Sequence, residues 1–344
     1  MARGLRNGLS TGTCAAAAAK AACLFMEGAE DIFRVQVTLP DGEKVRLGVH
    51  DLSLRAGEYR AYVFKDGGDD PDATHGMRIG AGVRPAQRFM LYGGPGVGTV
   101  TRPGLAVSPG NPAINPVPAE MIRKAVAQAT KQSVAVRIIV PRGKEVAAKT
   151  FNRRLGIVGG ISILGSTGRV RPFSLSALRE TVRLNLRQAL AAGWEEIVLV
   201  PGNIGRRFAL SRGYNLDQIV QVGNDWGAAL ESLNRIGGCR TAMFGHPGKL
   251  LKLTAGDFDT HSKRSKSAVF VLAGKMVSVL GHGPQKGAGS VQEILDCLAS
   301  EERKAVCNGL AEDVLEAVSE KAPGYVSLVR LIDLRGGELG YARR

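Results

Sequence analysis

The chain has 344 residues, enough for two domains with sizeable cores, and a net charge of +15 from 46 basic and 31 acidic residues. A positive field of this size favours a polyanionic partner, but the sequence contains no helix-turn-helix pattern, RNP-type aromatic strand or zinc-finger spacing. No apolar run is long enough to span a membrane, the N-terminus lacks the apolar segment of a secretion signal, and the five cysteines are scattered, so we expect a soluble, cytoplasmic protein with no membrane partner.

The first part of the chain, residues 1–150, is expected to form an α+β domain with antiparallel strands. Alanine-rich residues 9–27 predict a helix, and Thr11-Gly12-Thr13 at its start would leave free N–H groups suited to a carboxylate. Alternating residues 33–39 and 44–49 around a Pro-Asp-Gly turn predict a hairpin. Further elements are expected as strands at 59–64, 88–101 and 133–140 and a helix at 119–131.

Residues 151–250 are expected to form a parallel, Rossmann-like α/β domain. Residues 155–210 read as apolar strand, glycine loop and helix, twice over, with Ser174 and Gly193 as the ends of the first helix. Strands at 218–222 and 240–244 flank a helix at 225–236. Because ligands bind beyond the carboxyl ends of such strands, the loops Gly165–Gly168 and Gly202–Gly205 are candidate binding loops. The fold class is therefore α/β.

The last segment, residues 251–344, reads as mainly helical, with amphipathic stretches at 290–298 and 302–319. We expect it to pack back on the first domain.

Four carboxylates lie close together between Lys65 and Asp72. Their spacing does not fit an EF-hand. Crowded carboxylates raise one another's pKa, which would suit Asp69 or Asp70 to act as a general base near neutral pH. The alternative is a solvated acidic turn that caps itself.

Two further stretches could bind a small molecule. Gly94, Gly96 and Gly98 could let a backbone approach a nucleotide or a carboxylate, although no helix follows at once and a glycine-rich turn is the alternative. Two histidine-containing stretches downstream are rich in basic residues, and they suggest an anion site unless the histidines are structural; they comprise His246, Lys249, Lys252, His261, Lys263, Arg264 and Lys266. No His/Cys cluster has zinc spacing, so no protein metal site is expected.

Taken together, these strings resemble the CbiD family, the cobalt-precorrin-5B C-1 methyltransferases of anaerobic cobalamin biosynthesis. The resemblance runs in order over about residues 5–265 and is carried by Thr11–Lys20, Lys65–Thr74, Pro103–Val107, Asn111–Pro118, Gly160–Pro172, Val200–Gly205, Gly245–Leu250 and Thr260–Ser262.

The resemblance implies methyl transfer from S-adenosylmethionine to C-1 of cobalt-precorrin-5B, giving cobalt-precorrin-6A. The substrate is a polycarboxylate macrocycle that carries the cobalt itself, so the positive charge has a small-molecule partner and nucleic acid is not needed. The implied cofactor-binding residues are Gly94, Gly96, Gly98, Gly165, Thr167, Gly168, Gly202 and Asn203. The implied substrate-binding residues are Thr11, Thr13, Lys65, Arg169, Arg171, His246 and Lys249. Asp70 and His261 are the catalytic candidates, with Asp70 preferred as base because Pro71 fixes the backbone after it.

Two other functions stay open on the sequence. One is a non-catalytic polyanion or nucleic-acid binder, which only the charge suggests. The other is a different small-molecule transferase that uses the same glycine loops for a nucleotide phosphate. The sequence leaves open whether the protein is a homo-oligomer.

Overall fold

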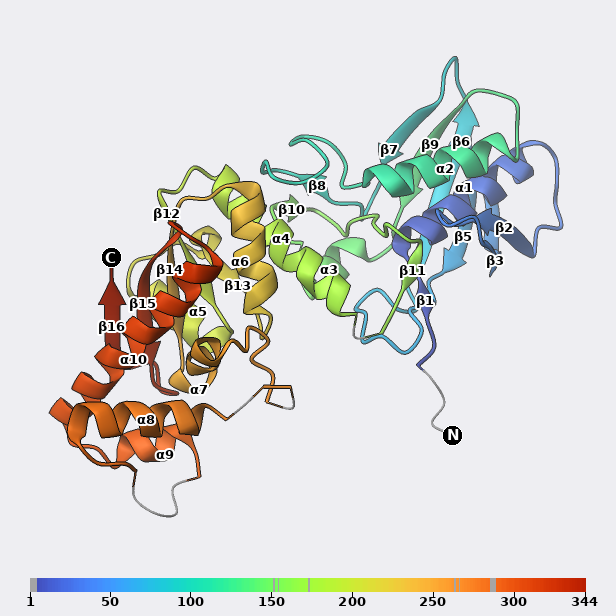
Figure 1. Ribbon diagram of the computed structural model, residues 1–344. Helices are drawn as coiled ribbons and strands as arrows, with labels where there is room; N and C mark the ends of the chain where they lie inside the picture. Colours follow the sequence, from blue (N-terminus) through green and yellow to red (C-terminus); the bar gives the residue numbers. More distant parts are fainter. Residues whose placement is uncertain are drawn as a thin grey trace. The chain divides into compact units, whose positions relative to one another are not determined.

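The computed structural model describes residues 5–150, 152–153, 155–172, 174–262, 264–265, 267–284 and 289–344. The chain divides into two compact units, unit 1 (Met1–Ser174) and unit 2 (Leu175–Arg344). Figure 1 shows the elements of each. The boundary at Ser174 lies later in the chain than residue 150, where the sequence suggested it, and the helical segments of the tail are grouped with unit 2.

In its described residues, unit 1 combines a mixed sheet with an antiparallel hairpin and three helices. Its helices are α1 (Thr11–Met26), α2 (Pro116–Ala127) and α3 (Gly143–Ala147). Its strands are β1 (Gly8–Leu9), β2 (Arg34–Thr38), β3 (Lys44–Gly48), β4 (His50–Arg55), β5 (Glu58–Phe64), β6 (Arg78–Pro85), β7 (Met90–Gly93), β8 (Thr99–Val100), β9 (Val134–Ile139), β10 (Ile157–Val158) and β11 (Arg169–Val170).

Helix α1 is the centre of unit 1. Its alanines and Cys14 and Cys23 are fully buried, because the small side chains let α2, β5 and β6 approach it closely. The main sheet has the order β4-β5-β6-β9-β7, and only the β7–β9 pair is parallel. The hairpin of β2 and β3 is confirmed. Strands β4 and β6 were not expected from the sequence.

Residues 157–170 form short pairings with the rest of unit 1, not a strand of the parallel sheet. Strand β10 pairs with β8, and β11 pairs with β1, both antiparallel. Ile161 and Ile163 make isolated bridges to Val97 and Ile114 and are buried in the core of unit 1. The expectation that Gly165–Gly168 follows a parallel strand was therefore wrong, because a short apolar run has the same pattern in either setting.

Unit 2 contains the expected parallel α/β arrangement. Its helices are α4 (Leu175–Ala191), α5 (Asn203–Ser211), η1 (Leu216–Gln218), α6 (Trp226–Ile236), α7 (Pro247–Leu250), η2 (Leu251–Ala255), α8 (Ala268–Leu280), α9 (Val291–Asp296) and α10 (Ser300–Lys321). Its strands are β12 (Glu196–Val200), β13 (Ile219–Gln221), β14 (Arg240–Gly245), β15 (Val326–Ile332) and β16 (Glu338–Arg343).

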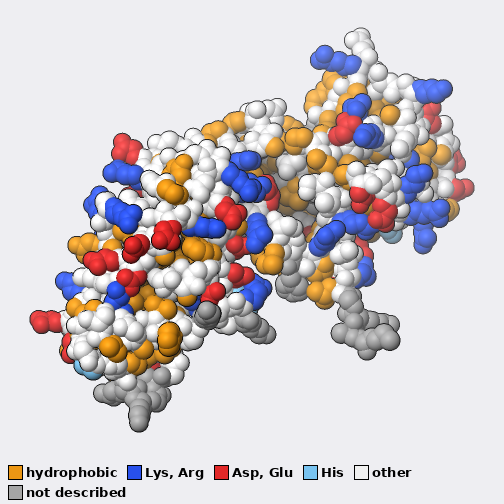
Figure 2. All heavy atoms as spheres, viewed as in Figure 1, with side chains coloured by type: hydrophobic (Ala, Val, Ile, Leu, Met, Phe, Trp, Pro, Cys, Tyr) orange, Lys and Arg blue, Asp and Glu red, His pale blue; other side chains and the backbone are white. Residues whose placement is uncertain are grey.

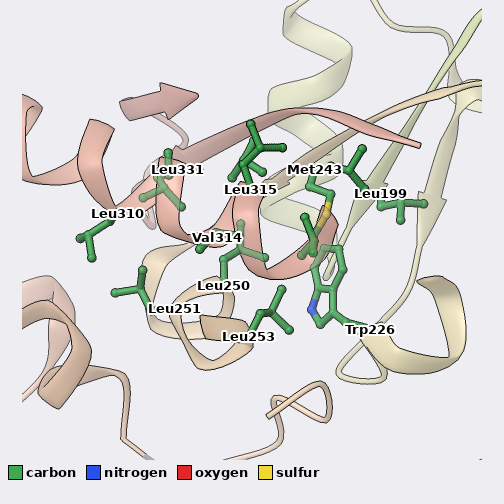
Figure 3. Close-up of a cluster of buried hydrophobic side chains, with 14 of the residues drawn as sticks. Leu199, Trp226, Met243, Leu250, Leu251, Leu253, Leu310, Val314, Leu315 and Leu331 are labelled. Atoms are coloured by element: carbon green, nitrogen blue, oxygen red, sulfur yellow. The ribbon is translucent and has the colours of Figure 1, made fainter. Parts of the chain in front are cut away.

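The sheet of unit 2 has the order β13-β12-β14-β15-β16, parallel except for β16. Ile197 and Leu199 of β12 face the core shared with α4, α6 and α10, whereas Val198 and Val200 face α5. This burial of both faces explains why β12 is continuously apolar. Figure 3 shows the first core, with Trp226 and Met243 packed beside the leucines. Strands β15 and β16 lie in the segment that was expected to be mainly helical.

Helices of the described ranges include none that is long and apolar enough to cross a membrane. On the face seen in Figure 2, Lys and Arg side chains are interspersed with acidic and apolar ones and form no continuous basic stripe.

Candidate functional site

The carboxyl end of the parallel sheet in unit 2 is the place where the topology favours a ligand. The chain runs from β12 through α5 to β13 on one side, and then to β14 on the other side of β12. The first connection leads from β12 to β13, and the second returns from β13 past β12 to β14, so the strand order reverses at β12. Open α/β sheets bind ligands in the crevice at such a reversal.

The loop after β12 leaves space at this position. A side chain at Gly202 would meet no atom within 4 Å, while one at Gly205 would meet Val200 and the Phe244 carbonyl oxygen. Gly202 is the N-cap of α5 and makes no side-chain cap hydrogen bond, so it does not satisfy the first N–H groups of the helix in the usual way. Asn203 is exposed, and its Oδ1 accepts a hydrogen bond from Gln221 Nε2 at 3.2 Å.

Lys249 connects the loops on the two sides of β12. It follows β14, and its Nζ donates to Oδ1 of Asn224, which follows β13, at 2.9 Å. Because β12 lies between β13 and β14, this hydrogen bond spans the carboxyl end of β12. Lys249 is half-buried, and burial, with a smaller effect of Lys252, lowers the pKa of its ammonium.

Lys252 lies in η2, which follows directly on the α7 helix of Lys249, and is only 8% exposed. Its Nζ donates to Ser265 Oγ at 2.8 Å and to the Thr260 carbonyl oxygen at 3.3 Å. Thr260 in turn donates its N–H to the carbonyl oxygen of Asn224. Both ammonium groups are therefore anchored to one hydrogen-bonded pair of residues, Asn224 and Thr260.

His246 has a structural role at the start of α7. Its Nδ1 accepts from Gly248 N at 3.0 Å, and its Nε2 lies 2.9 Å from Gln292 Oε1. The ring is therefore neutral with the proton on Nε2, and burial lowers its pKa. Both ring nitrogens have partners within the protein, so in this structure His246 holds the start of α7 and α9 and is not part of a free anion site.

Gln292 also lines a polar cavity of about 630 Å³ between α9, α10 and the β15–β16 turn. None of the site residues expected from the sequence lines this cavity.

His261 is half-buried, and its backbone N–H donates to Asp259 Oδ1 at 3.1 Å. Arg264 pairs with Asp259 at 2.7 Å. Lys263 and Lys266, which were also expected in the anion site, lie outside the described residues.

In unit 1, the start of α1 is satisfied by the protein itself. Ser10 caps the helix by accepting from Thr13 N, and Gly12 N donates to the Leu164 carbonyl oxygen. The Thr11 hydroxyl contacts the carbonyl oxygens of Ser162 and Leu164, and the Thr13 hydroxyl donates to the Gly168 carbonyl oxygen at 2.6 Å. The sequence suggested free N–H groups in Thr11-Gly12-Thr13 for a substrate carboxylate. The N–H groups of Gly12 and Thr13 instead donate hydrogen bonds to other parts of unit 1.

The acidic loop holds its charges by pairing with cations. Lys65 is buried, and its Nζ lies 2.5 Å from Asp72 Oδ2. Burial raises the pKa of Asp72, but hydrogen bonds from Lys65 and Thr74 outweigh it, so the net shift of that pKa is downward. The Arg6 guanidinium lowers the pKa of Asp66. The expected mutual rise in pKa is thus wrong for Asp66 and Asp72, because each has its own cation.

The other candidate residues of unit 1 have different surroundings from one another. Asp70 is half-buried, and its carbonyl oxygen accepts from Asp72 N at 2.7 Å. Asp69 is exposed and accepts from Arg6 N at 2.6 Å. Arg169 pairs with Glu43, whereas Arg171 is exposed.

At the candidate glycines of unit 1, neighbouring backbone or side-chain atoms occupy the space where a Cβ would lie. A Cβ at Gly96, where φ is +81°, would lie 1.9 Å from the Val140 carbonyl oxygen, and one at Gly94 would meet Ile138 O at 2.8 Å. A Cβ at Gly98 would meet Ile157 at 2.4 Å. Gly165 and Gly168 pack in the same way against Ser10 and Leu39, and Thr167 is exposed. These glycines permit close packing, because protein atoms already occupy the positions that their side chains would take.

The candidate residues are divided between the two units. Unit 1 holds Thr11, Thr13, Lys65, Asp70, Arg169, Arg171 and the glycines up to Gly168; unit 2 holds Gly202, Asn203, His246, Lys249 and His261. In the described ranges, no group of three or more His, Cys, Asp or Glu side chains could hold a metal ion. Asn224 was missed because a single asparagine in a loop carries no pattern, whereas Lys252 was seen only as part of the basic stretch.

Comparison with known proteins gives a consistent assignment. A family model described as CbiD matches residues 1–172. The chain is 40% identical over 98% of its length to the cobalt-precorrin-5B C(1)-methyltransferase of Syntrophotalea carbinolica, of which it covers 97%. It is 44% identical over 86% of its length to the protein of the same name from Clostridium perfringens, of which it covers 80%. A crystal structure described as the cobalamin biosynthesis protein CbiD from Archaeoglobus fulgidus matches at 31% identity with a TM-score of 0.43, covering 76% of this chain and 83% of that one.

Proposed function

The chain belongs to the CbiD family, and we propose that it is a cobalt-precorrin-5B C(1)-methyltransferase that uses S-adenosylmethionine as its methyl donor. The observation that carries this proposal is the similarity to curated enzymes of that name over nearly the whole chain. The product is the C-1-methylated macrocycle, cobalt-precorrin-6A, and the cobalt is part of the substrate.

The carboxyl end of the sheet in unit 2 is the proposed donor site. Support comes from the change of direction at β12 and from the open position at Gly202, where α5 begins without a side-chain cap. The backbone of Gly202 and Asn203 would hold the donor there. The glycines at 94–98 and 165–168 have less support, because neighbouring atoms already occupy the space beside them.

Methyl transfer from a sulfonium requires no nucleophile from the protein. An electron pair from C-1 of the macrocycle forms the new bond to the methyl carbon, and the carbon–sulfur pair goes to sulfur, which leaves as a neutral thioether. The residues of the chain therefore align the two substrates and exclude water. This accounts for a site built from loop backbone and cations.

A proton lost from the macrocycle needs an acceptor, and Asp70 is our first candidate. It lies half-buried on the loop before Pro71, which favours an extended backbone at Asp70. His261 in unit 2 is the second candidate. Asp70→Asn keeps the size of the side chain and removes the base, so methylation should slow strongly while S-adenosylhomocysteine binding is unchanged. A near wild-type rate in that variant would exclude Asp70 as the base.

The test of the function itself is an anaerobic assay with purified cobalt-precorrin-5B and S-adenosylmethionine carrying a labelled methyl group. The label should appear in the macrocycle, and S-adenosylhomocysteine should form in equal amount. A parallel thermal-shift experiment should show stabilisation by S-adenosylhomocysteine and none by ATP or NAD. Stabilisation by ATP or NAD without methyl transfer would favour a different transferase, and salt-sensitive nucleic-acid binding without adenosyl binding would favour a polyanion binder.

A further inference from the structure

In the part of the chain that the structure describes, buried charged side chains form ion pairs, with one exception. Among the residues that the structure describes, the buried charged side chains are Glu58, Lys65 and Lys252. Glu58 pairs with Arg60 at 3.0 Å and with Arg137 at 3.1 Å, and Lys65 pairs with Asp72. Lys252 forms no ion pair with any described carboxylate and contacts only a carbonyl and a hydroxyl oxygen.

Two carboxylates that adjoin Asn224 and Thr260 in the sequence pair with other cations. Asp225, next to Asn224, pairs with Arg179 at 2.6 Å and caps α6 by accepting from Ala228 N. Asp259, next to Thr260, pairs with Arg264. Lys249 likewise forms no ion pair within the described ranges, and its one hydrogen bond goes to the neutral amide of Asn224. The ammonium groups of Lys249 and Lys252 are therefore partly removed from water, and neither forms an ion pair with a described carboxylate.

Holding two such ammonium groups close together is unfavourable unless an anion joins them. The fold nevertheless holds them firmly. Leu250, Leu251 and Leu253, which flank Lys252, are buried in the main core of unit 2 (Figure 3). An ammonium group has three N–H donors, and the two lysines use three of their six in the contacts described, which leaves three donors for a ligand.

We propose that Lys249 and Lys252, held by Asn224 and Thr260, form a carboxylate-binding subsite at the carboxyl end of β12. The inference rests on the proposed function, which supplies two sources of a carboxylate. One is the amino-acid end of the methyl donor, and the other is an acetate or propionate group of the macrocycle. Lys249 follows β14 and Asn224 follows β13, and Gly202 follows β12 between them, so the subsite and the open loop lie at the same end of the sheet.

The decisive variant is Lys249→Gln, because this lysine is half-buried and its removal leaves no other charge without its partner. Lys249→Arg keeps the charge, and Lys304→Gln removes an exposed lysine of the same unit as a control for net charge. Binding of S-adenosylhomocysteine and of 5′-methylthioadenosine, which lacks the carboxylate, is measured by titration calorimetry for each protein. The Michaelis constant for cobalt-precorrin-5B is measured in parallel.

If the donor's carboxylate occupies the subsite, Lys249→Gln should weaken S-adenosylhomocysteine binding by about tenfold to a hundredfold and leave 5′-methylthioadenosine unaffected. If a macrocycle carboxylate occupies it, adenosyl binding should stay unchanged and the Michaelis constant for the macrocycle should rise by a similar factor. In either case Lys249→Arg should recover part of the loss, and Lys304→Gln should behave as wild type.

Three results would overturn the subsite. In Lys249→Gln, the first is no change in either the affinity for S-adenosylhomocysteine or the Michaelis constant for the macrocycle, and the second is an equal fall in the affinities for both adenosyl compounds. The third such result is a similar loss of affinity in Lys304→Gln. A purely structural lysine would also lower the melting temperature of the unliganded protein, whereas we expect Lys249→Gln to melt no lower than wild type. Failure of the proposed function looks different, because the wild-type protein would then neither bind S-adenosylhomocysteine nor transfer a methyl group.

Discussion

The glycine loops of the two units look alike in the sequence but serve different ends. In unit 1, Gly96 and Gly98 lie against backbone and side chains that a Cβ would overlap. In unit 2, Gly202 borders space, and Gly205, three residues later, packs α5 against the sheet. A glycine therefore indicates a ligand loop only where its missing side chain is not already replaced by protein atoms.

The charged groups show the same contrast. The acidic loop of unit 1 is neutralised locally, with Lys65 on Asp72 and Arg6 on Asp66. The basic segment of unit 2 keeps Lys249 and Lys252 without an anionic partner in the part of the chain that the structure describes. Asp66 and Asp72 of unit 1 are thus paired within their own unit, whereas Lys249 and Lys252 of unit 2 are the groups that an anionic ligand would complete.

The largest effect is expected for Gly96→Ala. The new Cβ would meet the Val140 carbonyl oxygen at 1.9 Å, and the positive φ would add strain, so the free energy of unfolding should fall by about 3 kcal/mol or more. Urea unfolding by circular dichroism measures this. Tryptophan fluorescence reports on unit 2 alone, because Trp194 and Trp226 both lie there. A variant as stable as wild type would show that the loop has room for a ligand.

Asp72→Asn should come next. It leaves the buried ammonium of Lys65 without its counter-ion, at a cost of about 3 kcal/mol at neutral pH. Since the folded-state pKa of Asp72 is lowered, its contribution is fully present above the ordinary carboxyl pKa and is lost as pH falls through the lowered value. The stability gap between wild type and variant, measured by urea unfolding at several pH values, should therefore narrow in acid. A gap that widened in acid would contradict the pairing.

A smaller effect, about tenfold between low and physiological ionic strength, is expected in the association rate of cobalt-precorrin-5B. The net charge of +15 should attract the polycarboxylate substrate, and added salt should screen that attraction. Stopped-flow mixing at constant pH measures the rate. Lys249→Gln should retain most of the salt dependence, since it removes one charge among many. A rate that ignores salt would argue against an electrostatic approach step.

The smallest effect on stability is expected for Gly202→Ala. Its backbone is extended and its surroundings are open, so the free energy of unfolding should change by no more than about 0.5 kcal/mol. The added methyl group would nevertheless narrow the proposed donor site and weaken S-adenosylhomocysteine binding. Urea unfolding and calorimetry on the same preparation give both values. Unchanged affinity would remove Gly202 from the donor site.

Local patterns in the sequence were sufficient for α1, the β2–β3 hairpin and the run from α4 to β14, because periodicity and capping act within one element. They failed for residues 157–170, whose partners β8 and β1 are distant in the sequence, and for β15, whose neighbour β14 lies before the helices α7–α10. The site shows the same limit. A basic segment could be seen around Lys249, but which carboxylates remain for its lysines depends on tertiary pairing at Asp225 and Asp259.

Hydrogen–deuterium exchange of the full chain with and without S-adenosylhomocysteine tests the central contrast most directly. We predict slower exchange on binding in the loops that follow β12, β13 and β14, covering 201–205, 222–225 and 246–252, with no change at 94–98. Protection confined to 94–98 or 165–168 of unit 1, with the loops of unit 2 unaffected, would contradict the account.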